Sequence, residues 1–134
     1  MFNDDTLSPG AVWPLHPHRD NEVVTYCACG EFWHEDERGK GGILRTIVYN
    51  SHPGALRIVS DAAVYSCFLE KGKKANHTLG AGRGAYLYVL EGGPVELNGI
   101  HIPELGAAKI KEEAELSVEA KRDAELLLVE VLLV

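Results

Sequence analysis

Short apolar stretches alternate with polar turns along most of this 134-residue chain. The apolar stretches are rich in Val, Ile, Leu and Tyr, and the turns contain Gly, Pro and Asn. Strands that recur every ~8–12 residues between such turns are typical of an all-β sandwich or barrel. The predicted strands cover residues 23–29, 43–49, 56–59, 62–69, 85–90, 95–97, 100–102, 107–110, 114–118 and 125–133.

The clearest hairpin is expected around Asn98 and Gly99, which separate two of these strands. Asn-Gly supplies both positive-φ positions of a type I′ turn. Two other turns are expected from composition: a Gly-rich one at residues 37–42 and a solvated, Lys-rich one at residues 71–74.

Residues 109–128 are open to two interpretations. They are rich in Glu, Lys, Ala and Leu, which favour a helix. Residues 114–120, however, alternate apolar and polar side chains without a break, which suits a half-buried strand. We favour the strand, and with it an all-β protein.

The apolar run at the end of the chain, residues 126–134, is interrupted only by Glu130. A strand that is apolar on both faces must be covered on both sides. We therefore expect the core to cover one face and something else, such as a second subunit, to cover the other.

Composition indicates one globular domain, because 46% of the residues are hydrophobic and domains most often contain ~100–150 residues. The net charge of −7 argues against a nucleic-acid partner, since phosphate binding needs clustered Lys and Arg. No apolar run reaches the ~20 residues that span a bilayer, and the acidic start of the sequence lacks a signal pattern. We expect a cytoplasmic protein with no membrane partner.

Three cysteines, Cys27, Cys29 and Cys67, are an odd number, which favours reduced thiols. Cys27 and Cys29 would share a face of a strand and pack there as small apolar groups. A mixed zinc site that combines them with His16 and His18 is the alternative.

His16 and His18 stand one residue apart, just before an apolar stretch. Side chains alternate between the faces of an extended backbone, so both imidazoles point to the same side. This pair can provide two metal ligands. Three further histidines, His34, His52 and His101, are candidates for a third or fourth ligand.

Each of these further histidines also has a simpler interpretation. His34 and His52 lie beside turns and are expected on the surface, and His101 is expected on the hairpin face opposite buried isoleucines. His77 is interpreted as an ordinary polar residue at a strand edge.

Residues 13–26, with the sequence WPLHPHRDNEVVTY, and residues 30–36 resemble the first cupin motif of the pirin family. That family includes bacterial pirin-like quercetin dioxygenases. Residues 56–59, 82–92 and 95–99 resemble the family's C-terminal cupin domain. The resemblance implies an all-β fold, with a single cupin-type β-barrel (double-stranded β-helix or jelly roll) and extra N-terminal strands.

The same resemblance implies how the chain is organised. Residues 1–134 would form a single cupin-like domain, in which residues 11–50 are the remnant of the N-terminal pirin cupin. Residues 55–134 would be the C-terminal pirin-type cupin. The back of the first barrel would then be missing, so that the chain is a shortened member of the family.

Pirins hold a divalent metal through His-x-His and a later His-x-Glu. His16 and His18 match the first pair, whereas the sequence after Gly42 enters the C-terminal-type domain without a His-x-Glu. In the related germin-like pattern the third ligand is a Glu four positions after the second His, which is Glu22 here. The resemblance thus implies a site of two histidines and one carboxylate for Fe, Ni, Mn or Zn.

Two functions from different classes follow. The first is a metal-dependent dioxygenase of quercetinase type, in which the metal polarises the substrate as a Lewis acid. The second is a non-catalytic cupin that binds a small molecule or another protein. This alternative stays open because the fold alone does not fix the activity.

Residues 12–49 contain too few strands to close a barrel, so their edges must be paired or covered. We expect them to add strands to the C-terminal barrel, within the chain or exchanged with a partner to give a homodimer. The apolar last strand would then lie at or near the interface.

Overall fold

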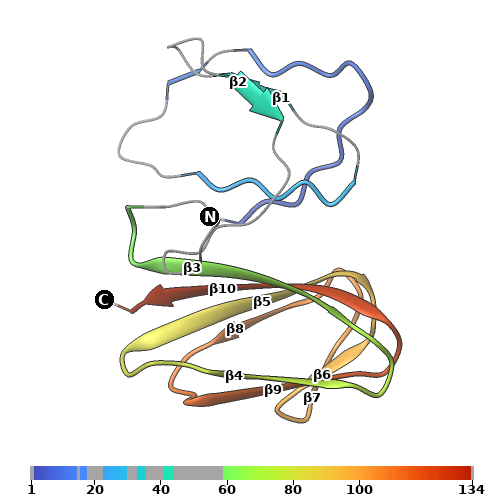
Figure 1. The fold of residues 1–134 in the computed structure, drawn as a ribbon, viewed down its shortest axis with the longest axis vertical. Helices are drawn as coiled ribbons and strands as arrows, with labels where there is room; N and C mark the ends of the chain where they lie inside the picture. The colour runs from blue at the N-terminus through green and yellow to red at the C-terminus, as the bar shows by residue number, and fades with distance from the viewer. Residues whose placement is uncertain are drawn as a thin grey trace.

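The protein is described by a computed structural model. The described residues are 2–14, 16–17, 23–29, 33–35, 41–43 and 59–133. They contain strands and no helix, and Figure 1 shows the course of the chain. The strands are β1 Trp33–Glu35, β2 Gly41–Ile43, β3 Ala62–Leu69, β4 Lys74–Thr78, β5 Arg83–Gly92, β6 Val95–Leu97, β7 Ile100–Ile102, β8 Ala107–Ile110, β9 Glu115–Ala120 and β10 Ala124–Leu132.

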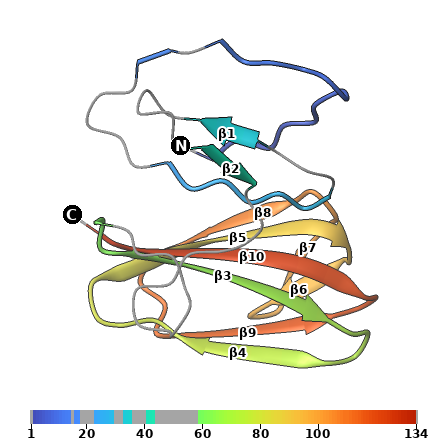
Figure 2. The same ribbon diagram turned by 45° about the horizontal axis from the view of Figure 1, so that its top comes forward.

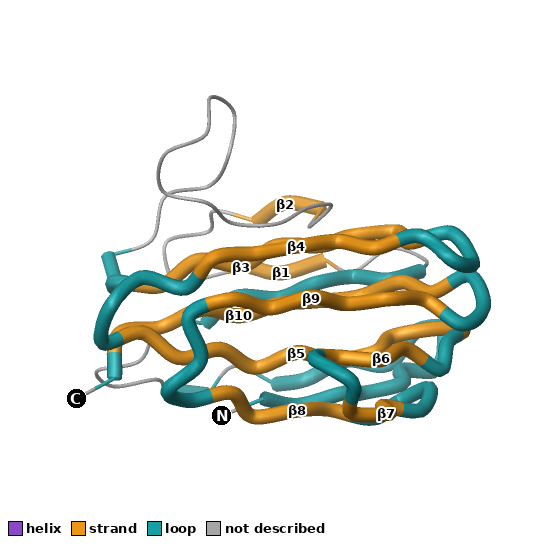
Figure 3. Tube along the Cα trace, turned by 90° about the horizontal axis from the view of Figure 1, so that it is seen from below, coloured by secondary structure: helices purple, strands orange, loops and turns teal. Residues whose placement is uncertain are grey.

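Two four-stranded antiparallel sheets face each other, with strand orders β3-β10-β5-β8 and β4-β9-β6-β7. The separate pair β1-β2 lies with the N-terminal part of the chain, above the first of these sheets (Figures 1 and 2). β3 runs beside β4 at one edge of the sandwich, and β8 beside β7 at the other (Figure 3). Among the described residues β3 and β4 each pair with one neighbour only, so the barrel is not closed there.

The core lies between the two sheets and is built by alternation along the strands. In β9, Leu116, Val118 and Ala120 are buried, while the residues between them are partly exposed. Burying a side chain of the size of Leu116 or Val118 contributes about 1.5–3 kcal/mol. The remaining core residues are Leu69, Leu79, Ala85, Leu87, Val89, Val95, Leu97, Ile102, Ile110, Ala124 and Leu126.

The predicted all-β class is confirmed, and most predicted strands of the C-terminal part are found. Strands 62–69, 95–97, 100–102 and 107–110 have the predicted bounds, and those at 85–90, 114–118 and 125–133 differ by one or two residues at their ends. No helix forms in residues 109–128, because the strict alternation around β9 buries one face against the opposite sheet.

Other predictions about the strands were wrong or incomplete. Residues 23–29 are irregular, because they join no ladder and Val23 and Val24 are exposed. The expected Lys-rich turn runs into β4, whose sequence KANHT has no apolar alternation to reveal it. β1 was not predicted, and β2 begins inside the expected Gly-rich turn.

Two predicted strands lie largely outside the described residues. Of residues 43–49, only Ile43 is described, and it ends β2. Of residues 56–59, only Val59 is described, and it is an exposed bend residue.

The hairpin predicted at Asn98 and Gly99 is confirmed. Both residues have positive φ, 47° and 82°, and Leu97 pairs with Ile100 across the turn. The Asn98 side chain also accepts a hydrogen bond of 2.8 Å from the Ser117 backbone, which ties the turn to β9. The turn therefore follows from local chemistry and is fixed by a tertiary contact.

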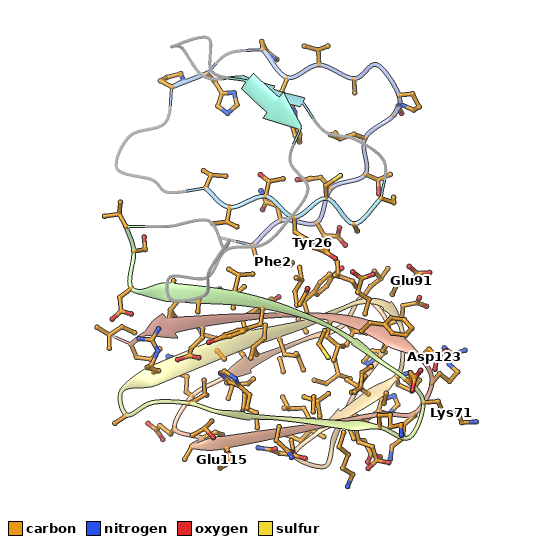
Figure 4. The ribbon with its side chains drawn as sticks, in the orientation of Figure 1. Phe2, Tyr26, Lys71, Glu91, Glu115 and Asp123 are labelled. Carbon is orange, nitrogen blue, oxygen red and sulfur yellow. The ribbon has the colours of Figure 1, made fainter. Side chains whose placement is uncertain are left out.

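The outer face of the β3-β10-β5-β8 sheet is covered in part by residues of the same chain, above all by residues 2–14, here called the N-terminal arm. The Phe2 ring lies 5.2 Å from the ring of Tyr86 and 5.0 Å from that of Tyr88. The Tyr88 hydroxyl donates to the Asp4 carboxylate. Figure 4 shows Phe2 and Tyr26 above this sheet.

Tyr26 adds a second anchor, because its hydroxyl donates to the Glu125 carboxylate of β10. The second face expected for the C-terminal strand therefore finds part of its cover within its own chain, and Leu127 on that face is 4% exposed. Val131, Leu132 and Leu133 remain exposed at the end of the strand.

Within the described part of the chain, no helix is long and apolar enough to cross a membrane.

We predict that Gly92→Ala is more destabilising than Gly72→Ala. Both glycines have φ of +76°, but a Cβ at Gly92 would lie 2.0 Å from the Asp123 carbonyl oxygen, whereas nothing lies within 4 Å of one at Gly72. Positive φ alone costs roughly 1 kcal/mol, and the clash must add to it, for an expected loss above about 2 kcal/mol at Gly92. Urea unfolding of both variants measures the difference, and equal losses would contradict the close approach.

We predict that contact of the N-terminal arm with the sheet weakens as the pH rises from 10 to about 12. The hydrogen bond to Asp4, together with burial, raises the pKa of Tyr88 from 10.0 to about 12. Burial and the bond to Glu125 raise the pKa of Tyr26 likewise to about 12. Because the folded state favours the neutral phenol, this stabilisation is complete below pH 10 and is lost as the pH approaches 12.

Ultraviolet titration of tyrosine ionisation tests this assignment. Asp4→Ala should shift the late titration of Tyr88 toward pH 10, and a Tyr88→Phe variant identifies which transition belongs to that residue. Asp5→Ala is the matched control, since the exposed neighbour makes no such bond. If Tyr88 ionised at the same pH in Asp4→Ala as in the wild type, the N-terminal arm would not lie on the sheet in this way.

Candidate functional site

His16 is the member of the predicted metal set that the structure describes. It is exposed, and its Nδ1 donates a hydrogen bond of 2.9 Å to the carbonyl oxygen of Pro14. In the neutral ring this bond places the lone pair on Nε2, the arrangement in which metal-ligating histidines are commonly held. His18 and Glu22 lie outside the described residues. The three-residue set therefore stays a prediction.

No other metal site replaces it in the described ranges. They contain no group of three or more His, Cys, Asp or Glu side chains that could hold a metal ion. His101 is exposed, and His52 lies outside the described residues. His34 is part of β1, of which only the backbone is described.

One detail of the His101 prediction was wrong. Ile102 is buried, as expected, but Ile100 is 67% exposed. The hairpin lies at the end of its sheet, with β7 paired only to β6 among the described strands, so the residue after the turn projects beyond the core.

The cysteines are free, as predicted. Cys27 and Cys29 do not share a strand face: Cys29 is exposed, and the Cys27 thiol donates to the Cys29 carbonyl at 3.3 Å in an irregular segment. The mixed zinc site would also need His18, which is outside the described residues.

A different group of functional side chains meets between the two sheets of the sandwich. It consists of Asp61, Arg83, Glu130 and His77, and is here called the Glu130 cluster. Nε2 of His77 lies 2.8 Å from Oε2 of Glu130, and Nε of Arg83 donates to Oε1 of the same carboxylate. A terminal nitrogen of Arg83 reaches Asp61 at 2.8 Å.

The strand register explains why Glu130 lies inside. On β10 it alternates with Val129 and Val131, and its cross-strand neighbours are Ala63 on β3 and Ala85 on β5. These two small residues leave room for the carboxylate on the inner face. Glu130 is only 7% exposed, and it is the one buried charged residue among those that the structure describes.

The Arg83 guanidinium balances the negative charge of Glu130. The hydrogen bond to Asp61 raises the pKa of Arg83 against the opposing effect of burial, and Glu130 raises it further, so the guanidinium stays charged. An ionised carboxylate only accepts hydrogen bonds, so His77 donates from Nε2. In the neutral form of the His77 ring, this bond leaves the lone pair on Nδ1.

A cavity of about 160 Å³ opens beside the cluster, between β3 and β4. Its walls are mostly apolar and include Leu87 and Leu128 from one sheet and Leu116 from the other. Tyr65, Cys67 and His77 supply its polar groups. The rings of Tyr65 and His77 lie 4.8 Å apart at 60°, and burial raises the pKa of the Cys67 thiol.

Sequence reasoning missed this site. His77 was interpreted as a strand-edge residue, and Arg83 lies outside the strands predicted from the sequence. The available signal was Glu130, a single charge in a strand expected to be covered on both sides. A carboxylate in that position needs cationic partners, and their identity could not be read from the chain.

Comparison with protein-family models finds two matches that together span nearly the whole sequence. Residues 1–51 match the model described as Pirin. Residues 49–131 match the model described as Quercetinase C-terminal cupin domain, which covers more than half of the chain.

Curated proteins give the same picture. A pirin-like protein of Caulobacter vibrioides is 27% identical over 190 residues, covering 97% of this chain and 82% of that protein. A quercetin 2,3-dioxygenase of Escherichia coli K12 is 22% identical over 185 residues, covering 96% of this chain and 80% of the enzyme. Both alignments are longer than the 134 residues of this chain, so these relatives contain residues without a counterpart here.

Solved structures share the fold. A bacterial pirin of Escherichia coli in complex with nickel(II) is similar with a TM-score of 0.63 and 24% identity, over 71% of this chain and 44% of that one. A quercetin 2,3-dioxygenase of Acinetobacter baumannii is similar with a TM-score of 0.57 and 26% identity, over 74% of this chain and 35% of that one. The matched part thus spans less than half of each of these structures.

We predict that Glu130→Gln destabilises the protein by about 3 kcal/mol, because Arg83 keeps the exposed carboxylate of Asp61 but loses the buried one of Glu130. Glu96→Gln is the matched control: it removes a carboxylate 2.8 Å from Lys121, but both side chains are more than a third exposed. Such a surface pair contributes less than about 1 kcal/mol. Urea unfolding compares the two, and equal losses would contradict the importance of the buried cluster.

Proposed function

This chain belongs to the pirin family of cupin proteins, and we propose that it binds a divalent metal ion through His16, His18 and Glu22 and has quercetinase-like dioxygenase activity. The observation that carries the proposal is the orientation of His16 by the Pro14 carbonyl, within a His-x-His pair. That pair lies in residues 1–51, which match the Pirin model.

The names of two similar proteins support the chemistry. One is a bacterial pirin whose structure contains nickel(II), and another is a quercetin 2,3-dioxygenase. We therefore place Ni first among the candidate metals, with Fe, Mn and Zn as the others. When bound, such an ion supplies a Lewis acid that polarises a substrate oxygen. The chain's own contribution at this site is to hold His16 in the tautomer with its lone pair on Nε2.

A second candidate function is a non-catalytic cupin that binds a small molecule. It is favoured by the cavity of about 160 Å³ in the C-terminal sandwich. Oxygen consumption with quercetin as substrate separates the two functions, since only a dioxygenase consumes oxygen with it.

The other proposals rest on the sequence. We propose a homodimer, supported by the edges of β3 and β4 that pair with no other described strand and by the exposed Leu132 and Leu133. We also propose a single domain of residues 1–134, with an N-terminal remnant at 11–50 and a C-terminal cupin at 55–134. A cytoplasmic location stays a prediction from composition.

We predict that the protein binds about one Ni(II) per chain and that His16→Ala with His18→Ala abolishes this binding. Removal of two of three ligands leaves a single carboxylate, which is insufficient for a stable site. Elemental analysis after anaerobic loading and desalting measures the metal, and Glu22→Gln tests the third ligand.

His101→Ala is the control, because that exposed histidine lies on β7, far along the chain from the motif. It should leave the metal content unchanged. Undiminished metal in the double variant would refute the assignment of His16 and His18. Metal binding without oxygen consumption would instead favour the non-catalytic function.

A further inference from the structure

The cavity of the C-terminal sandwich is lined entirely by residues of β3, β4, β5, β6, β9 and β10. It shares no residue with the metal set proposed above. The exposed Ser66 of β3 and Asn76 of β4 are among its lining residues, and neither strand has a further described partner. A ligand could therefore enter without displacing a strand of the sandwich.

The size of the cavity selects its occupant. Its volume is about 160 Å³. A cavity of about 150 Å³ lined by aliphatic side chains stays dry and holds one benzene molecule. Leu87, Leu116 and Leu128 provide walls of that kind from both sheets. The cavity thus has room for a single aromatic ring.

The polar side of the cavity selects the ligand's functional group. Nε2 of His77 donates to Glu130, so Nδ1 is the ring nitrogen left to accept a hydrogen bond from a ligand when the ring is neutral. Among the described residues no hydrogen bond reaches Nδ1 of His77. A hydroxyl group on the ligand can donate to it. The nearby Glu130 carboxylate and the apolar walls disfavour an anion.

We propose that this cavity is a binding site for a small neutral monocyclic phenol, whose hydroxyl donates to Nδ1 of His77 while its ring packs between the two sheets. The site is independent of the metal, and the proposal rests on the second candidate function above, for which it names the class of ligand. The Glu130 cluster acts as its positioning element, because it holds the imidazole in one tautomer and orientation.

Protection of Cys67 measures binding directly, because this thiol lines the cavity. The protein is treated with N-ethylmaleimide with and without phenol, and modification is followed by mass spectrometry. Phenol should slow the labelling of Cys67 at least about fivefold near saturation, while the exposed Cys29 reacts at an unchanged rate and serves as internal reference. Toluene, which lacks the hydroxyl, should need about fivefold higher concentration, and benzoate should not protect.

Variants separate the ring pocket from the hydrogen bond. His77→Phe should abolish the advantage of phenol over toluene while toluene still protects, which also shows that the variant is folded. Ala75→Leu fills the cavity and should remove protection by both compounds, whereas Ala107→Leu, at an exposed position of β8, should not. In the His16→Ala, His18→Ala double variant, phenol should protect Cys67 as it does in the wild type. Failure of the metal proposal would therefore leave the phenol proposal intact.

The proposal would be overturned by no protection of Cys67 by phenol, by equal protection by phenol and toluene in the wild type, or by an advantage of phenol that persists in His77→Phe. Protection that survives Ala75→Leu would place the ligand elsewhere and would overturn it as well.

Discussion

The burial of one carboxylate between two apolar sheets is the constraint on which the C-terminal sandwich depends. An ionised carboxylate inside a protein is costly unless it is paired and hydrogen-bonded. Glu130 meets this requirement through Arg83 on β5 and His77 on β4, and Arg83 is held in turn by Asp61. The cluster therefore joins strands of both sheets at the side where the barrel is open.

The same constraint explains the cavity. Ala63 and Ala85 flank Glu130 on the inner face and leave space for its carboxylate. His77 is held toward β10 and stacks against Tyr65 instead of filling the interior. The space behind these residues has aliphatic walls. The hydrogen-bonded Glu130 cluster therefore lies next to the apolar core, and the side chains around it leave the cavity unfilled.

The outer face of the β3-β10-β5-β8 sheet is not buried by the second sheet of the sandwich. It is covered in part by the N-terminal arm, through the ring of Phe2 and the bond from Tyr88 to Asp4, and by Tyr26 through Glu125. Residues on either side of the pirin-like His-x-His pair thereby contact the C-terminal cupin. This chain is shorter than the alignments to its curated relatives. The contacts bring its two matched regions together.

The sequence by itself determined the strands of the C-terminal part and the hairpin at Asn98 and Gly99, because alternation and turn chemistry act between near neighbours. It also identified the family and the His16–His18 pair through a local motif, although the structure describes only His16 of that set. β4 escaped prediction because its sequence carries no apolar period. Only the tertiary structure decided the Glu130 cluster, since His77 and Arg83 lie 53 and 47 positions from Glu130. Such a meeting depends on strand order and register, which no local pattern specifies.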